Sequence, residues 1–154
     1  MLTSPVTGVA VTGLTSPTYT LSADKPPSPW STQFAVTGIG GTQTGVDTGA
    51  ATTRPWTATF YKPSAFKQLN AVDANNVLRN VANNSYSLLI RKGVSVLSGQ
   101  PSRLHQIRTE FVVPAGSDTE DVPNLKAAYS FFGGVVTQAA DNMVDLMTTG
   151  VMAS

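Results

Sequence analysis

The spacing of apolar residues changes once along this chain, near Pro114, and that change constrains the fold more than any other feature. Over residues 86–113, apolar residues alternate with polar ones, as on strands with one buried face. Over residues 122–149, they recur at intervals of three and four, as on one side of a helix. Strands followed by helices predict an α+β fold with the helices segregated to one part of the molecule.

Residues 86–96 and 103–113 are the clearest predicted strands, joined by a short loop at residues 97–102. Their apolar parity comprises Tyr86, Leu88, Ile90, Val94 and Val96 in the first and Ile107, Thr109, Phe111 and Val113 in the second. Two residues depart from the pattern, because Lys92 falls on the apolar parity and Leu89 on the polar one. Residues 76–82 predict a further strand, so that three strands form an antiparallel meander.

The N-terminal half is rich in Thr, Ser, Gly and Pro and predicts short strands separated by turns. The predicted strands are residues 6–14, 18–22, 31–37 and 54–62. Thr15-Ser16-Pro17 is predicted as a turn and residues 38–53 as a Gly/Thr-rich loop. Residues 25–29 contain three prolines, which exclude a regular element there.

The helical part begins with acidic residues that suit the N-terminus of a helix dipole: Asp118, Glu120 and Asp121. Pro123 fits a first helical turn, and Gly150 is a natural stop. A break divides the helix in two, either at Gly133-Gly134 or near residues 140–141. Two helices cannot cover a sheet of six or seven strands, so part of their apolar stripe is expected to face a second subunit.

Charged residues make up only 12% of the 154 residues, about half of the ~25% typical of soluble domains. This shortage predicts that much of the surface does not face water alone. The net charge of +1 is also uneven, because residues 54–108 carry eight basic residues against one acidic, and residues 109–154 carry one basic against six acidic. A basic segment of this kind points to a polyanionic partner, with random scatter as the alternative.

Few residues offer catalytic or metal-binding chemistry. The chain has no Cys and a single histidine, His105, which is better explained as a structural residue. The acidic cluster at residues 118–121 is explained by the helix N-terminus, and the glycines of residues 38–45 do not complete a phosphate-binding loop. The sequence therefore predicts no enzyme activity, catalytic residue, cofactor or metal. It also shows no secretory signal and no apolar run of about 18 residues, so no membrane association is predicted.

The basic residues remain as the candidate site. Arg91 and Arg108 fall on the polar parity of neighbouring strands, together with Ser87 and Gln106, and Arg79 is placed beside them on the preceding predicted strand. Guanidinium groups can bind phosphate with two hydrogen bonds, and small polar groups can contact bases or sugars. An ordinary solvated sheet face explains the same pattern equally well.

From residue 76 to residue 152 the chain resembles the coat proteins of single-stranded RNA bacteriophages, the levivirus-like family. The resemblance rests on SYSLLIRKGV (85–94), IRTEFVVPAG (107–116), Asp118-Thr119, NLKAA (124–128) and DLMTTGV (145–151). It implies one coat-protein domain over residues 1–154, β-rich over 1–113, with a helical dimerisation segment over 118–150. The implied architecture is an N-terminal β-hairpin, a five-stranded antiparallel meander and two C-terminal helices, in an interlocked homodimer with a continuous sheet.

The resemblance further implies that dimers assemble into an icosahedral shell that packages single-stranded genomic RNA. An RNA hairpin bound to the inner sheet face would act as a translational repressor in such a protein. Assembly is expected in the bacterial host cytoplasm, and the mature location is the virion. The predicted RNA-binding residues are Arg79, Ser87, Arg91, Gln106 and Arg108, and the predicted dimer-interface residues are Leu125, Tyr129, Phe132, Val136, Met143 and Leu146.

The N-terminal half, taken alone, supports a different class of protein. A β-rich adhesin, pilin or phage tail protein without RNA binding is also Thr- and Gly-rich. The missing secretory signal argues against a pilin or surface adhesin. An enzyme that uses His105 or the acidic cluster is the third and weakest hypothesis.

Overall fold

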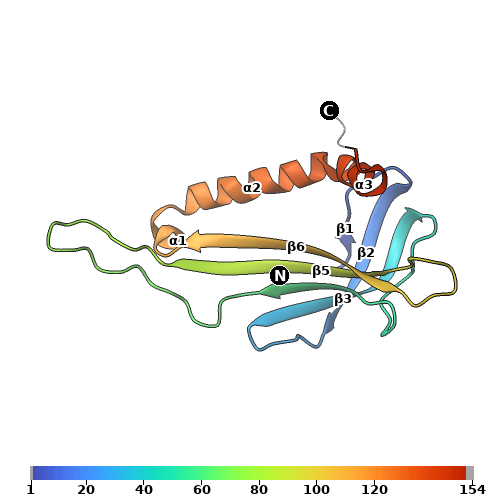
Figure 1. The fold of residues 1–154 in the computed structure, drawn as a ribbon, viewed down its shortest axis with the longest axis horizontal. Coiled ribbons are helices and arrows are strands. Elements are labelled where there is room, and N and C mark those ends of the chain that lie inside the picture. The colour runs from blue at the N-terminus through green and yellow to red at the C-terminus, as the bar shows by residue number, and fades with distance from the viewer. Residues whose placement is uncertain (1, 152–154) are drawn as a thin grey trace.

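The computed structural model describes residues 2–151, which form one antiparallel sheet followed by helices (Figure 1). Residue 1 and residues 152–154, the ends of the predicted domain, lie outside the described residues. The strands are β1 (Val6–Thr7), β2 (Leu14–Asp24), β3 (Ser31–Gln43), β4 (Trp56–Tyr61), β5 (Asn83–Val94) and β6 (Arg103–Pro114). Each strand pairs with its sequence neighbour, giving the order β1 to β6. The predicted α+β class, an antiparallel sheet followed by helices, is confirmed.

The register gives the sheet two chemically different faces, because directly paired residues point to the same side. The polar face carries Gln33, Thr57, Thr59, Ser87, Leu89, Arg91, Gln106, Arg108 and Glu110. The apolar face carries Phe34, Val36, Trp56, Ala58, Phe60, Tyr86, Leu88, Ile90, Ile107 and Phe111. β5 and β6 pair without interruption from Asn83 opposite Pro114 to Val94 opposite Arg103. The alternation expected for these two strands is therefore confirmed.

Strands β2 and β3 are longer than predicted, whereas β1 covers only Val6–Thr7 of the strand predicted at residues 6–14, and β4 is slightly shorter than its predicted range 54–62. Thr15-Ser16-Pro17 is not a turn but part of β2, where a bulge shifts the register between Thr15 and Thr18. β3 likewise runs on to Gln43 and takes up the start of the predicted loop. Gly41 makes this pairing possible, since its φ is 74° and a Cβ there would lie 2.1 Å from the Ser16 carbonyl oxygen.

Residues 62–82 form a long excursion between β4 and β5, which we call the arm (Figure 1). The prediction of a strand at residues 76–82 is wrong. Asn76 and Asn80 both have positive φ angles, 57° and 58°, which take the backbone out of extended geometry at two points of this short segment. The three-stranded meander is instead made by β4, β5 and β6.

The helices are α1 (Ser117–Glu120), α2 (Val122–Gln138) and α3 (Ala140–Thr149). The predicted break near residues 140–141 is confirmed, because the chain leaves helical geometry at Ala139. Asp121 caps α2 by accepting a hydrogen bond from the Asn124 backbone N–H. Gly150 ends α3 in a left-handed conformation, as expected.

The helices cover little of the sheet. α2 runs alongside β6, and α3 lies near the end of β2, where Asp141 accepts a 2.7 Å hydrogen bond from the Thr12 N–H (Figure 1). The rings of Tyr129 and Phe132 each lie 5.7 Å from that of Phe111 on β6. No residue of α2 or α3 is buried. In residues 2–151 only three hydrophobic residues are buried: Val36, Leu89 and Ala115.

Candidate nucleic-acid interface

Four of the five residues predicted to bind RNA lie together on the polar face of β5 and β6. Arg91 pairs directly with Gln106, and Leu89 pairs with Arg108, so the two arginines are diagonal neighbours on adjacent strands. Ser87 follows on the same face, opposite Glu110. Gln106 and Arg108 are exposed, and Arg91 is half-buried. Diagonal neighbours are typically about 7–8 Å apart, a spacing that lets both guanidinium groups reach one segment of polyanion.

Arg91 is held in place by strands β3 and β4. Its Nη2 donates a 2.6 Å hydrogen bond to Gln33 Oε1, and its Nε donates a 3.2 Å hydrogen bond to Thr57 Oγ1. The same Gln33 oxygen accepts a 2.8 Å hydrogen bond from Thr59, while Gln33 Nε2 donates to Asp24 at 2.7 Å. Gln33 is only 8% exposed and Thr59 is fully buried. The guanidinium is therefore oriented in advance, with the remaining N–H groups able to bind an anion.

Sequence reasoning did not find this network. Thr57, Thr59 and Tyr61 do alternate with apolar residues in β4, so their parity was readable. Their alignment with Arg91 depends on pairing across β4 and β5, and Gln33 lies 58 positions away from Arg91. No local pattern marks Gln33 as its partner.

Arg79 is not on the sheet, so its predicted place beside Arg91 is wrong. It lies in the arm, where its Nε donates a 2.8 Å hydrogen bond to Asp73 and its side chain is 70% exposed. The pKa of Asp73 is lowered by the Val77 backbone N–H and by the Arg79 guanidinium. Arg79 therefore stabilises the tip of the arm and does not belong to the polar face.

Other basic residues of the segment 54–108 are also held away from the polar face. Lys92, next to Arg91 in sequence, lies on the apolar face with its ammonium 3.8 Å from the centre of the Trp56 ring and 3.4 Å from Asp47. Arg54 forms a 2.6 Å ion pair with the same aspartate. Arg54 and Lys92 are therefore held by Asp47 and are separate from the two arginines of the polar face.

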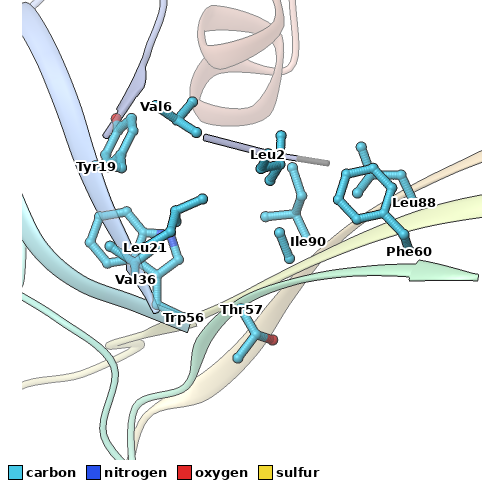
Figure 2. Close-up of a pocket in the computed structure, with 11 residues that line it drawn as sticks. Leu2, Val6, Tyr19, Leu21, Val36, Trp56, Thr57, Phe60, Leu88 and Ile90 are labelled. Carbon is cyan, nitrogen blue, oxygen red and sulfur yellow. The ribbon is translucent and has the colours of Figure 1, made fainter. Parts of the chain in front are cut away.

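The apolar face leaves an open cleft of about 350 Å³ between strands β2 to β5 and the N-terminal segment (Figure 2). Leu2 and Val6 lie on one side of it, and side chains from the sheet form the rest. These sheet residues are Tyr19, Leu21, Val36, Trp56, Ala58, Phe60, Leu88 and Ile90. Figure 2 shows Thr57 pointing away from the others, as its place on the polar face requires.

The predicted dimer-interface residues divide into two groups. Tyr129 and Phe132 contact Phe111 of the same chain, although Tyr129 remains 62% exposed. Val136 and Met143 are half exposed, whereas Leu125 and Leu146 are partly covered. Exposed apolar residues that the prediction did not include are Phe131, Val135, Val144 and Met147. Leu88 and Ile90 of the apolar face line the open cleft.

The structure does not favour His105 or the acidic cluster at residues 118–121 as catalytic groups. His105 is on the apolar face opposite Lys92, and the acidic residues of the 118–121 cluster serve the start of α1 and α2. No group of three or more His, Asp or Glu residues within residues 2–151 is arranged to hold a metal ion. Among the described helices, none is both long and apolar enough to span a membrane.

Comparison with known proteins identifies the family. No protein-family profile and no curated protein matches the chain. Among solved structures, the chain is similar to that of the virus-like particle of bacteriophage ESE020, with 42% sequence identity, 98% of each chain covered and a TM-score of 0.93. The chain belongs to the levivirus-like family of coat proteins. It is a capsid protein, as the sequence resemblance predicted.

Two more distant coat-protein structures share the fold. The chains of the virus-like particles of Beihai levi-like virus 32 and Wenzhou levi-like virus 4 are each 15% identical to this coat protein. Their TM-scores are 0.56 and 0.54, with 88% and 94% of this coat protein covered and 89% and 86% of theirs. The arrangement of sheet and helices is therefore retained although little of the sequence is retained. The hypothesis of an adhesin, pilin or tail protein has no support from these comparisons.

Proposed function

We propose that this coat protein dimerises through its apolar face and β6, assembles into an icosahedral shell in the bacterial host cytoplasm, and packages single-stranded RNA against its polar face in the virion. The observation that carries the proposal is the contrast between the two faces. One presents two arginines on adjacent strands, of which Arg91 is held by hydrogen bonds, and the other exposes apolar surface that a lone chain cannot cover.

The accessible surface supports the assembly part of the proposal. A compact monomer of 16.1 kDa is expected to expose about 7,400 Å². This chain exposes 10885 Å², which is about 3,500 Å² more. A standard protein interface buries only about 800 Å² of each partner, so the excess calls for contacts with several neighbouring copies.

The dimer follows from the position of β6 and the helices. β6 is twelve residues long, and its outer edge pairs with no strand of the described residues. An uncovered edge of this length favours pairing with another strand. Two β6 strands joined at their edges would continue the sheet from one subunit into the next. The helices of each subunit could then cross onto the apolar face of the other, where Phe60, Leu88 and Ile90 line the open cleft.

The RNA part of the proposal rests on Arg91 and Arg108, with Ser87 and Gln106 beside them. Phosphate contacts by arginine do not depend on the base sequence. Leu89 is buried in the middle of this face, at 7% exposure, and offers no group that reads a base. We therefore expect general packaging of single-stranded RNA. Repression of translation through a specific hairpin is the narrower form of the proposal.

The experiment uses the full-length protein expressed in bacteria. We expect particles of megadalton mass whose absorbance ratio at 260 to 280 nm shows nucleic acid. For the double variant Arg91→Ala/Arg108→Ala we expect intact dimers with several-fold less RNA. The binding constant K of dissociated dimers for short single-stranded RNA should fall as the salt concentration rises. Loss of two phosphate contacts should make the slope of log K against log salt concentration less steep by about 1.4.

Arg103→Ala is the matched control, because Arg103 is on the same strand as Arg108 but has the opposite parity. It removes one positive charge and should leave the RNA content unchanged. Equal RNA content in the double variant and the wild type would refute the proposed RNA face. A purified wild-type protein that stays monomeric would refute the assembly proposal. A hairpin bound no better than a scrambled RNA would exclude the repressor role.

A further inference from the structure

We propose that the arm, residues 62–82, is a contact between neighbouring dimers, with its apolar side chains docked on a second copy of this chain. The inference rests on the proposed assembly into a shell, but it concerns a surface that neither the dimer nor the RNA face uses. Figure 1 shows the arm projecting past the ends of β5 and β6, on the side away from α3.

The arm has a defined conformation. At its tip the Asp73 carboxylate accepts hydrogen bonds from the backbone N–H groups of Asn75 and Val77, each at 2.9 Å, and from Arg79. Further back, Asn70 Nδ2 donates a 2.9 Å hydrogen bond to the Asn80 carbonyl oxygen. The two sides of the arm are thereby tied together, as in an irregular hairpin.

The base of the arm is fixed to the sheet by Asn84, which is only 5% exposed. Its side chain accepts from the Lys67 N–H at 2.8 Å and donates to the Lys67 carbonyl oxygen at 2.9 Å, as a neighbouring strand would. The Phe66 ring also lies 6.4 Å from that of Tyr86 on β5. A segment ordered in this way loses little conformational entropy when it binds a partner.

The surface of the arm is apolar and open. Six large hydrophobic side chains are between 39% and 60% exposed: Phe66, Leu69, Val72, Val77, Leu78 and Val81. Two of its charged residues, Asp73 and Arg79, already pair with each other. An ordered projection with this composition is typical of a protein-contact surface, because exposed apolar patches of this extent mark interaction sites.

The most suitable occupant is another copy of this chain. The loop between β5 and β6 is a shorter projection that is fixed at its base, where Ser102 donates a hydrogen bond to the Thr53 carbonyl oxygen and Arg54 donates one to Ser95 (Figure 1). The arm is the longer projection at the opposite end of these strands. In a shell, neighbouring dimers must contact each other through surfaces other than the dimer interface. The arm also contributes to the excess of about 3,500 Å² over a compact monomer.

The test compares two variants at the tip. Val72→Ser/Val77→Ser removes two exposed apolar side chains but leaves every backbone hydrogen bond of the turn in place. Asn75→Ala is the control, since it changes an exposed polar side chain of the same turn. Each variant is purified, and dimers, RNA binding by dissociated dimers, and the mass fraction in particles are measured by light scattering and sedimentation.

We expect the double variant to keep its dimers and its affinity for short RNA, while the fraction assembled into particles falls at least tenfold. Asn75→Ala should assemble like the wild type. Replacing residues 68–81 by a Gly/Ser linker, which retains Phe66 and Lys67, should give the same result as the double variant. Normal particle formation by both arm variants would overturn the inference, and so would loss of dimers, which would place the arm inside the dimer. If the wild type itself forms no particles, the proposed function fails instead.

Discussion

The two faces of the sheet differ in how much of their structure a single chain completes. On the polar face, Gln33 and Thr57 already accept hydrogen bonds from the Arg91 guanidinium, Thr59 donates to the same Gln33 oxygen, and Leu89 is buried. On the apolar face, a cleft of about 350 Å³ stays open, and Tyr129 is 62% exposed although it contacts Phe111. A surface completed within the chain is ready for a ligand. A surface left incomplete indicates that another chain completes it.

The largest effect is expected from a charge introduced into the predicted dimer interface. Val136 on α2 is 50% exposed and belongs to the predicted dimer interface. Val136→Asp would bury an unpaired carboxylate in that interface, at a cost of several kcal/mol. We expect dimerisation to weaken at least a hundredfold, measured by analytical ultracentrifugation over a range of protein concentrations.

Gln138→Asp is the control for this change. Gln138 is an exposed polar residue on the same helix, so the added charge stays in water. Its dimers should be as stable as those of the wild type. If Val136→Asp dimerises equally well, α2 is not in the interface, and the apolar face must be covered in another way.

A smaller effect is expected when the hydrogen-bond network of the polar face is disrupted. Gln33→Leu removes the oxygen that accepts from Arg91 and Thr59 and leaves a buried hydroxyl without its partner. The free energy of unfolding of the dimer should fall by about 1–3 kcal/mol, as measured by denaturant titration. RNA affinity should fall as well, because Arg91 is no longer oriented. Unchanged affinity would show that the network serves stability alone.

The neighbours Arg91 and Lys92 test the separation of the faces directly. Arg91→Met should lower the RNA content of particles, whereas Lys92→Met should leave it unchanged, although each removes one positive charge. Lys92→Met should instead cost about 1 kcal/mol of stability through the lost contact with Trp56. RNA content is measured by absorbance and stability by thermal unfolding. Equal loss of RNA in the two variants would mean that net charge, not the face, governs packaging.

The smallest effect concerns the arm, which belongs to neither face. The pKa of Asp73 lies below its ordinary value of 3.8, so the ionised carboxylate stabilises the tip. That contribution is complete above pH 3.8 and is lost as the pH falls through the lowered pKa. The protection factor of the Val77 N–H against hydrogen exchange, which corrects for the intrinsic pH dependence of the rate, should therefore fall only in strong acid. In Asp73→Asn, this protection factor should be lower at neutral pH and should not fall further in acid.

Local patterns in the sequence predicted the parts of the fold that depend on near neighbours. The alternation in β5 and β6 placed Arg91 and Arg108 on one face, and the acidic residues, Pro123 and Gly150 marked the ends of the helices. The predicted position of Arg79 was wrong because Asn76 and Asn80 adopt positive φ angles. Asparagine tolerates this conformation but does not require it, so the sequence alone does not reveal it. The Gln33 network could not be predicted, since it depends on pairings among four strands.

The order of the strands also bears on how the protein reaches its assembled state. Because every strand pairs with its predecessor, the strand pairing of the whole sheet can form by successive antiparallel additions of the next strand in sequence. The helices that expose the apolar stripe are synthesised after the sheet. The apolar stripe that would bind a second copy is therefore made only after the sheet that supports it. Refolding from denaturant should accordingly show a fast phase independent of protein concentration, followed by a slower one whose rate rises with concentration.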